Sequence, residues 1–381
     1  MSAAPEARAP LNQPARTMKI TQIDIIEAVM PFADGGSGMG ITPTRWDTLD
    51  AVFVRLQTDT GIVGWGECFA YSCRTAVAAS ARDMIAPLVL GRELAATPEA
   101  LNLEIQRKLH IFGRYGIAMY AISGFDIALW DIAAKAQDKP LHALLGPARR
   151  DAVPAYASLV RYGDAALVDT WCRHALARGY RNVKLHEVDP QVIRAGRAAC
   201  GPEIGISVDV NCAWTPEQAQ AQLETMRAID AAWLEEPVFP PEDVIAQAAL
   251  NRAFPLGAGE NACTRHEFAR IIATDAVTYL QPSVTKVGGV TEFVAVAALA
   301  KAHGKAVMPH SPYFGVGYFT TLQLMAGLHG EPLFEHLYVQ LDADLALGGT
   351  PLPADGRVAI PQRPGHGFEP DMALLQRYRV D

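Results

Sequence analysis

Basic residues are in the minority in this chain, which has 33 lysines and arginines against 41 aspartates and glutamates and a formal net charge of −8. Nucleic acids and anionic membrane surfaces bind basic faces, so we expect neither as a partner. Cysteine is also scarce, and the six cysteines form no CxxC or zinc-type spacing. This pattern argues against a disulfide framework and favours a reduced, cytoplasmic protein that acts on a small molecule.

Long apolar runs are missing as well. Residues 1–17, rich in proline and alanine, lack the apolar segment of a signal peptide, and we expect a disordered extension there. The most apolar stretch, Ala118–Gln137, carries three charged side chains and is predicted to be a buried helix rather than a membrane span. With 381 residues and 50% hydrophobic content, the chain can form two domains, or one barrel with an appended domain.

Residues 18–148 have the pattern of an α+β domain that caps the rest of the chain. Period-two alternation predicts antiparallel strands, and helical periodicity follows them. We expect strands over 19–30 and within 51–69, and helices over 75–90, 98–112 and 118–137. The glycine-rich stretch Asp34–Trp46 is too long for a tight turn, and we predict that it is a mobile lid.

Residues 149–355 repeat a strand-then-helix pattern, which predicts a (β/α)8 barrel. The eight expected strands are 153–158, 182–186, 205–210, 231–236, 256–260, 277–282, 306–310 and 333–337. The fold class is therefore α/β, a TIM-like barrel with an N-terminal α+β capping domain. We expect the last segment, 356–381, to return to that cap and complete it.

Three carboxylates stand at the ends of three successive barrel strands. Asp209, Glu235 and Glu260 are separated by 26 and 25 residues, or one strand-helix unit each. The carboxyl ends of barrel strands all meet at one face, so these side chains should converge there. Buried like charges need a counter-ion, and all-oxygen ligation favours Mg²⁺. Taken singly, each carboxylate could instead be a helix cap or a solvated loop residue.

Other polar side chains also stand at the ends of the predicted strands. Lys184 and His186 are two residues apart on the second strand and so lie on the same face, and both should point into the barrel mouth. A structural ion pair for the lysine and a helix cap for the histidine are the alternatives. The remaining strand-end polar residues are Asn211, Glu236, Ser283, His310 and Glu335.

These residues resemble those of the mandelate racemase subgroup of the enolase superfamily, and the likeness runs along the whole chain from Met18. The motifs that carry it are GWGE after the hairpin, FDIALWDIAAKA in the cap, KxH, DxN, EEP and GEN on the second to fifth strands, KVGG after the sixth, and a histidine on the seventh. The resemblance implies an enzyme that removes the proton α to a carboxylate with help from Mg²⁺, a reaction the family is known for. It also implies a homo-oligomer, from dimer to octamer.

Roles for individual residues follow from the resemblance. Asp209, Glu235 and Glu260 would be Mg²⁺ ligands, with Asn211 and Glu236 next to them, and Glu335 would hydrogen-bond a substrate oxygen. The Mg²⁺ ion and Lys184 would stabilise the dianionic intermediate formed when the α-proton leaves.

Two positions depart from the family pattern. Relatives usually carry KxK where this chain has Lys184 and His186, so His186 is the expected base. Relatives with the seventh-strand histidine have an aspartate on the sixth strand, where this chain has Ser283. A hydroxyl can orient His310 but cannot stabilise an imidazolium as a carboxylate does, so His310 should deliver a proton rather than remove one.

The predicted function is a Mg²⁺-dependent lyase that dehydrates a sugar acid or related hydroxy acid, with Lys184, His186 and His310 as the catalytic residues. The alternatives are a racemase, an epimerase or a cycloisomerase, and a non-catalytic relative that only binds carboxylates. Substrate specificity is expected in the lid, including Trp46, and in the segment after His310, where Tyr313 and Phe314 could shape the pocket.

Overall fold

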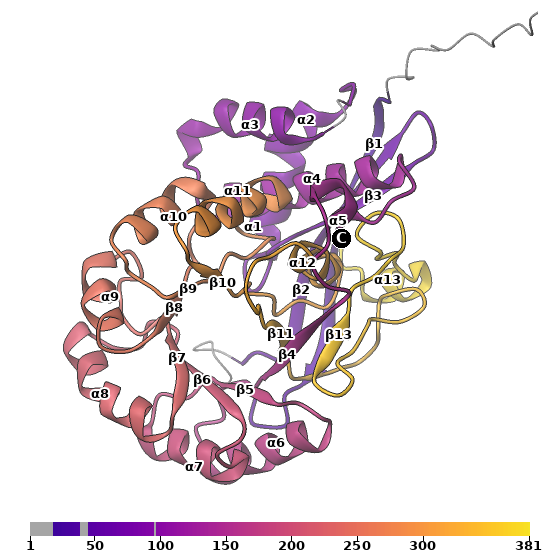
Figure 1. The fold of residues 1–381 in the computed structure, drawn as a ribbon. Coiled ribbons are helices and arrows are strands. Elements are labelled where there is room, and N and C mark those ends of the chain that lie inside the picture. The colour runs from indigo at the N-terminus through magenta and orange to yellow at the C-terminus, as the bar shows by residue number, and fades with distance from the viewer. Residues whose placement is uncertain (1–17, 39–44, 95–96) are drawn as a thin grey trace, which may run out of the picture.

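The structure is a computed structural model that describes residues 18–38, 45–94 and 97–381. The predicted extension 1–17 and the central part of the predicted lid, residues 39–44, lie outside the described residues. Figure 1 shows two layers of organisation: a ring of helices around a set of parallel strands, and a smaller group of strands and helices packed against one side of it.

The cap begins with an antiparallel sheet in the order β12-β1-β2-β3. Its strands are β1 (Ile20–Ala33), β2 (Thr48–Thr58), β3 (Val63–Cys68) and β12 (Gln340–Leu341). The cap helices are α1 (Arg74–Ala79), α2 (Ala86–Val89), α3 (Glu99–Lys108), α4 (Gly116–Lys135) and α5 (Leu141–Leu145), with a π-helical turn (Ser80–Ile85) between the first two and a 3₁₀ turn (His110–Phe112) after the third. The predicted strands and helices of this region are present, and the helix expected over 75–90 contains the π-helical turn.

Helix α4 is long and apolar enough to cross a membrane by length and composition, and 89% of its most apolar window is buried inside the protein. It packs directly on β3, where the sequence GWGE supplies glycines. A Cβ atom at Gly66 would lie 1.8 Å from the carbonyl oxygen of Gly124 in α4, so only glycine permits this approach. The close contact explains why the motif alternates glycine with larger residues.

All eight predicted barrel strands are present, in one sheet of order β10-β9-β8-β7-β6-β5-β4-β11 with parallel pairing between neighbours. The strands are β4 (Ala152–Ser158), β5 (Asn182–Leu185), β6 (Gly205–Asp209), β7 (Ala231–Glu235), β8 (Leu256–Ala258), β9 (Tyr279–Leu280), β10 (Ala306–Val307) and β11 (Phe334–Leu337). The first and eighth strands, β4 and β11, pair with each other, so the sheet curls back on itself. The architecture is a TIM barrel with a capping domain.

The helices that follow these strands in the chain lie outside them (Figure 1). They are α6 (Ala165–Ala177), α7 (Pro190–Cys200), α8 (Pro216–Ala228), α9 (Val244–Asn251), α10 (Thr264–Ala273), α11 (Gly289–Ala302) and α12 (Val316–Met325). Helix α8 begins as its sequence predicts, because Thr215 and Gln218 form a capping box and Pro216 occupies the first turn.

The chain returns to the cap after the eighth strand, as expected. Strand β12 pairs with β1, and near the C-terminus the backbone of Val380 donates to the carbonyl of Glu27. Between them, β13 (Arg357–Ala359) pairs antiparallel with barrel strand β4, and α13 (Met372–Tyr378) follows. The last segment therefore contacts both domains, and the domain limits at 148 and 355 stay predictions.

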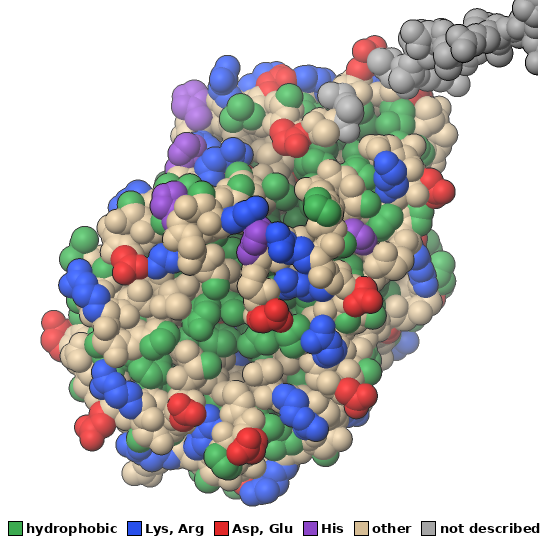
Figure 2. All heavy atoms as spheres, viewed as in Figure 1, with side chains coloured by type: hydrophobic (Ala, Val, Ile, Leu, Met, Phe, Trp, Pro, Cys, Tyr) green, Lys and Arg blue, Asp and Glu red, His purple; other side chains and the backbone are tan. Residues whose placement is uncertain are grey.

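Over most of the face shown in Figure 2 acidic and basic side chains are interspersed, and near its upper centre several basic side chains gather beside a histidine.

Candidate active site

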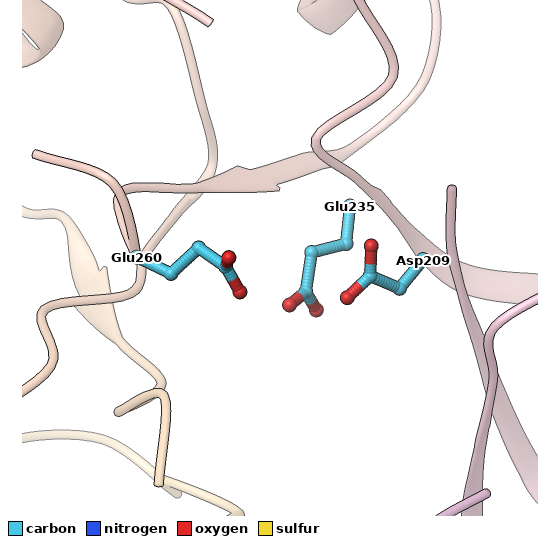
Figure 3. A group of neighbouring side chains, drawn as sticks. All are labelled: Asp209, Glu235 and Glu260. Carbon is cyan, nitrogen blue, oxygen red and sulfur yellow. The ribbon is translucent and has the colours of Figure 1, made fainter. Parts of the chain in front are cut away.

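The three predicted carboxylates converge at the mouth of the barrel. Asp209 and Glu235 are the last residues of β6 and β7, and Glu260 follows β8. Each offers an oxygen within 4.8 Å of the others, and in Figure 3 Glu235 lies between Asp209 and Glu260. The equal length of the strand-helix units brings the carboxylates together, because each unit returns the chain to the same face.

Burial and neighbouring charges give these carboxyl groups different proton affinities. Burial raises the pKa of Glu235 to about 8. Burial opposes ionisation of Asp209 too, yet Lys184 and His186 hold the pKa of this carboxyl well below its usual range. For Glu260, the nearby His310 outweighs burial and lowers the pKa to about 2. Without a cation, burial and mutual repulsion therefore oppose full ionisation of the triad.

Lys184 is the nearest positive charge to the triad. Its side chain is fully buried, and Nζ lies 3.2 Å from Asp209 Oδ2, 3.0 Å from Glu235 Oε1 and 2.7 Å from Glu335 Oε1. Burial alone would lower the pKa of Lys184, but these carboxylates raise it well above its usual value. Lys184 therefore stays a cation. Glu335 is held further by hydrogen bonds from the Ser158 hydroxyl at 2.9 Å and the Ser311 amide at 2.9 Å.

His186 lies at the Asp209 end of the triad. Its Nε2 is 3.2 Å from Asp209 Oδ2, and its Nδ1 is hydrogen-bonded to the carbonyl of Leu159. A carbonyl only accepts, so Nδ1 carries a hydrogen and Nε2 is the nitrogen directed at the site. Arg161 holds the strand end from outside, donating to the His186 carbonyl at 2.7 Å and to Asn211 Oδ1 at 3.0 Å.

His310 lies at the other end, with Nε2 3.0 Å from Glu260 Oε2. The sequence predicted that the Ser283 hydroxyl could orient this ring. In the structure Ser283 instead contacts the hydroxyl of Tyr313, and it is the Tyr313 hydroxyl that lies 3.4 Å from His310 Nδ1. Ser283 and Tyr313 are both buried behind His310.

A second polar chain lies beside Glu260. Lys286 Nζ donates to Asn261 Oδ1 at 3.0 Å, and Asn261 Nδ2 donates to Glu236 Oε2 at 2.9 Å. Burial, and then the charges of Glu260 and Asp209, raise the pKa of Glu236 well above its usual value. The ammonium of Lys286 also lies 4.7 Å from the centre of the Phe69 ring.

The two histidines face a cavity of ≈ 230 Å³ between barrel and cap. Its polar lining includes Ser158, His186, Asn211, Glu260, Lys286, His310 and Glu335, and its apolar lining includes Trp46, Phe69, Tyr71, Pro312 and Leu337. Trp46, at the end of the predicted lid, packs on Phe32 and Tyr71 with ring centroids 5.1 and 5.7 Å apart. Four of the predicted site residues do not line this cavity: Lys184, Glu236, Ser283 and Tyr313.

A larger cavity of ≈ 490 Å³ lies on the other side of β11. Glu335 and Leu337 of this strand face the smaller cavity, whereas His336 and Tyr338 face the larger one, as strand alternation requires. Phe314, which the sequence placed in the substrate pocket, lines this larger cavity. Of the triad, Glu260 lines the smaller cavity and no member lines the larger one, so the smaller cavity is the candidate active site.

Residues 167–374 match the model of the enolase C-terminal domain-like family, and residues 38–146 match that of the mandelate racemase / muconate lactonizing enzyme N-terminal domain. The chain belongs to the mandelate racemase / muconate lactonizing enzyme family of the enolase superfamily. The resemblance drawn from the strand-end motifs is confirmed.

Individual relatives agree with this membership. The chain is 31% identical to a D-galactarolactone cycloisomerase of Agrobacterium fabrum, over 88% of this chain and 93% of that one. It is 29% identical to an arabinonate dehydratase of Saccharolobus solfataricus, over 87% and 91%. The L-talarate/galactarate dehydratase of Salmonella typhimurium LT2 superposes with a TM-score of 0.83 at 26% identity, over 100% of this chain and 97% of that one. An L-talarate/galactarate dehydratase variant solved with Mg and L-glucarate superposes with a TM-score of 0.84 at the same identity and coverage.

Some residues that line the candidate active site were not predicted from the sequence. Phe69 and Tyr71 come from the cap, directly after GWGE, and only the packing of cap on barrel brings them to the cavity. Ser158 was detectable, because it ends the first barrel strand and pairs in register with Lys184. Lys286 is the first residue of the KVGG motif, and the motif by itself indicates no role for the lysine.

Proposed function

We propose that this chain is a Mg²⁺-dependent lyase that removes the proton α to a carboxylate and dehydrates a sugar acid or related hydroxy acid. The observation that carries this proposal is the pair of imidazoles, His186 and His310, at the two ends of one carboxylate triad and lining one cavity. An acid and a base placed this way can act on the same small molecule. The named activities of the relatives are of the same chemical kind.

The triad fits the proposed ion. Asp209, Glu235 and Glu260 offer only oxygen donors, within 4.8 Å of one another, and Mg²⁺ is bound in proteins through such carboxylates. These three residues would hold the ion, which when bound supplies positive charge to the substrate carboxylate. The raised pKa of Glu235 supports the fit, since a buried excess of acid is expected where a cation belongs.

His186 is the proposed base. Its Nδ1–H is held by the Leu159 carbonyl, so Nε2 is the ring nitrogen left for proton transfer. Nε2 lies 3.2 Å from Asp209 Oδ2, and it would be free to take a proton when the ion holds that carboxylate. Lys184 is not suited to this role, because its three carboxylate contacts keep it protonated. Instead Lys184 contributes fixed positive charge next to Glu335, which lines the cavity.

His310 is the proposed proton donor. The base takes the α-proton, the C–O bond at the β-carbon breaks, and a proton from His310 converts the departing hydroxyl into water. The group at His310 Nδ1 is a neutral hydroxyl rather than a carboxylate, so no negative charge stabilises the protonated ring from behind. This makes His310 better suited to releasing a proton than to removing one from carbon.

The second candidate is cycloisomerisation, which the 31% identity to a D-galactarolactone cycloisomerase favours. It would use the same base, with His310 returning a proton to carbon instead of to a leaving group. The mass of the product separates the two reactions, because dehydration loses water and cycloisomerisation does not. Homo-oligomeric assembly and a cytoplasmic location stay predictions.

The test is a panel of sugar acids and their lactones incubated with enzyme and Mg²⁺ in deuterated solvent, followed by mass spectrometry and NMR. Wild type should form product and exchange the α-proton. His186→Asn should lose both by about 10²–10⁴-fold, whereas His310→Asn should lose product and keep exchange. The opposite pattern in the two variants would reverse the roles of base and acid, and binding without exchange or product would refute an enzyme.

A further inference from the structure

The ring of His310 is held from two sides by different kinds of group. On one side Nε2 meets the Glu260 carboxylate at 3.0 Å, and on the other Nδ1 meets the Tyr313 hydroxyl at 3.4 Å. The two rings are nearly perpendicular, with centroids 6.0 Å apart and an interplanar angle of 86°. The hydroxyl of Tyr313 therefore approaches the edge of the imidazole, where its nitrogen lies.

Tyr313 itself is held in place. Its ring is buried, and its hydroxyl is hydrogen-bonded to the hydroxyl of Ser283, which is fully buried on the far side. Burial raises the pKa of Tyr313, so the phenol stays neutral and keeps its hydrogen. A hydroxyl both donates and accepts, so it can accept from Nδ1–H or donate to a bare Nδ1.

We propose that Tyr313, held by Ser283, is the positioning residue of His310, keeping Nε2 directed at the cavity whether the ring carries one hydrogen or two. The inference rests on the proposed role of His310 as proton donor. It assigns Tyr313 a different role from substrate binding, because neither Tyr313 nor Ser283 lines the cavity that holds His310. Both residues act through the histidine and not on the substrate.

The principal variant is Tyr313→Phe, which removes only the hydroxyl. A single hydrogen bond of this kind corresponds to about 3- to 10-fold in rate, so product formation should fall by that factor. The KM and the α-proton exchange performed by His186 should stay within about twofold of wild type. Ser283→Ala should lower product formation less, and the double variant should match Tyr313→Phe, because the two residues form one chain.

The matched control is Tyr318→Phe, which removes another buried tyrosine hydroxyl, one that donates to the Pro351 carbonyl at 2.7 Å. It should leave the ratio of product to exchange unchanged. A spectroscopic measurement accompanies the kinetics: in protein with ¹⁵N-labelled histidine, assigned with His310→Asn, the Nδ1 resonance of His310 should move in Tyr313→Phe and not in the control.

Three results would overturn the inference. A raised KM with unchanged kcat in Tyr313→Phe would make Tyr313 a substrate ligand. Equal losses of product and exchange would indicate a structural role. An unmoved His310 Nδ1 resonance would show that the contact does not hold the ring. If wild type neither exchanges nor converts any acid of the panel, the proposed function fails, and the resonance still decides whether Tyr313 positions His310.

Discussion

Replacing Lys184 by methionine tests how the buried charges of the site are balanced. The substitution keeps the length of the side chain and removes an ammonium that contacts three buried carboxylates at 3.2, 3.0 and 2.7 Å. Removing one partner of a buried ion pair costs about 3–5 kcal/mol, because the remaining charge is left unpaired. We expect a loss of that size in the free energy of unfolding at pH 8 without metal.

The pH dependence of the free energy of unfolding tests the direction of this effect. In wild type, Lys184 outweighs burial and lowers the pKa of Asp209 and Glu335, so their contribution to stability is present above pH about 4 and is lost at lower pH. Without the ammonium, burial raises the pKa of both groups above the unfolded value, and stability is lost as pH rises through the new values. The deficit of Lys184→Met should therefore be smaller at pH 5 than at pH 8.

Urea unfolding at both pH values, with a chelator and then with Mg²⁺, measures these differences. Added Mg²⁺ should restore part of the stability, since it supplies charge to the same carboxylates. The matched control is Lys305→Met, because Lys305 pairs with the exposed Asp275 and its loss should cost at most about 1 kcal/mol. If Lys184→Met costs no more than this control at pH 8, or its deficit does not shrink at pH 5, the charge balance described here is wrong.

Three further variants test other parts of the molecule. Burial raises the pKa of Glu67 from 4.5 to about 7, so the free energy of unfolding should fall as pH rises through this window. Glu67→Gln keeps an acceptor for the Gly317 amide and should remove up to about 3 kcal/mol of that fall, measured by unfolding at pH 5 and 8. An unchanged dependence of stability on pH would contradict this. Asp131→Ala should cost about 3–5 kcal/mol, because it leaves Lys135, 2.8 Å from the buried carboxylate, without its buried partner. It should also speed proteolysis of the C-terminal segment, because Asp131 accepts from the backbone of His366, and equal cleavage rates would show that this contact does not hold the segment. Glu235→Gln should weaken Mg²⁺ binding by more than about 100-fold in calorimetry while the fold survives, and an unchanged affinity would remove Glu235 from the ligand set.

The sequence by itself determined the elements of this protein and the residues at their ends. The period of a strand and of a helix is a local property, so alternation located all eight barrel strands and placed Lys184 and His186 on one face. The near-equal spacing of Asp209, Glu235 and Glu260 then implied their convergence, because each strand-helix unit ends at the same rim.

Only the tertiary structure decided which groups touch across elements. Ser283 was identified as a strand-end residue, but its hydroxyl contacts Tyr313, which comes from a different loop and whose hydroxyl lies 3.4 Å from His310 Nδ1. Phe69 and Tyr71 enter the cavity because the cap packs over the barrel, a contact that no local pattern encodes. Such pairings depend on distances between segments far apart in the chain, and these are set by packing of the whole core rather than by the periodicity of any one segment.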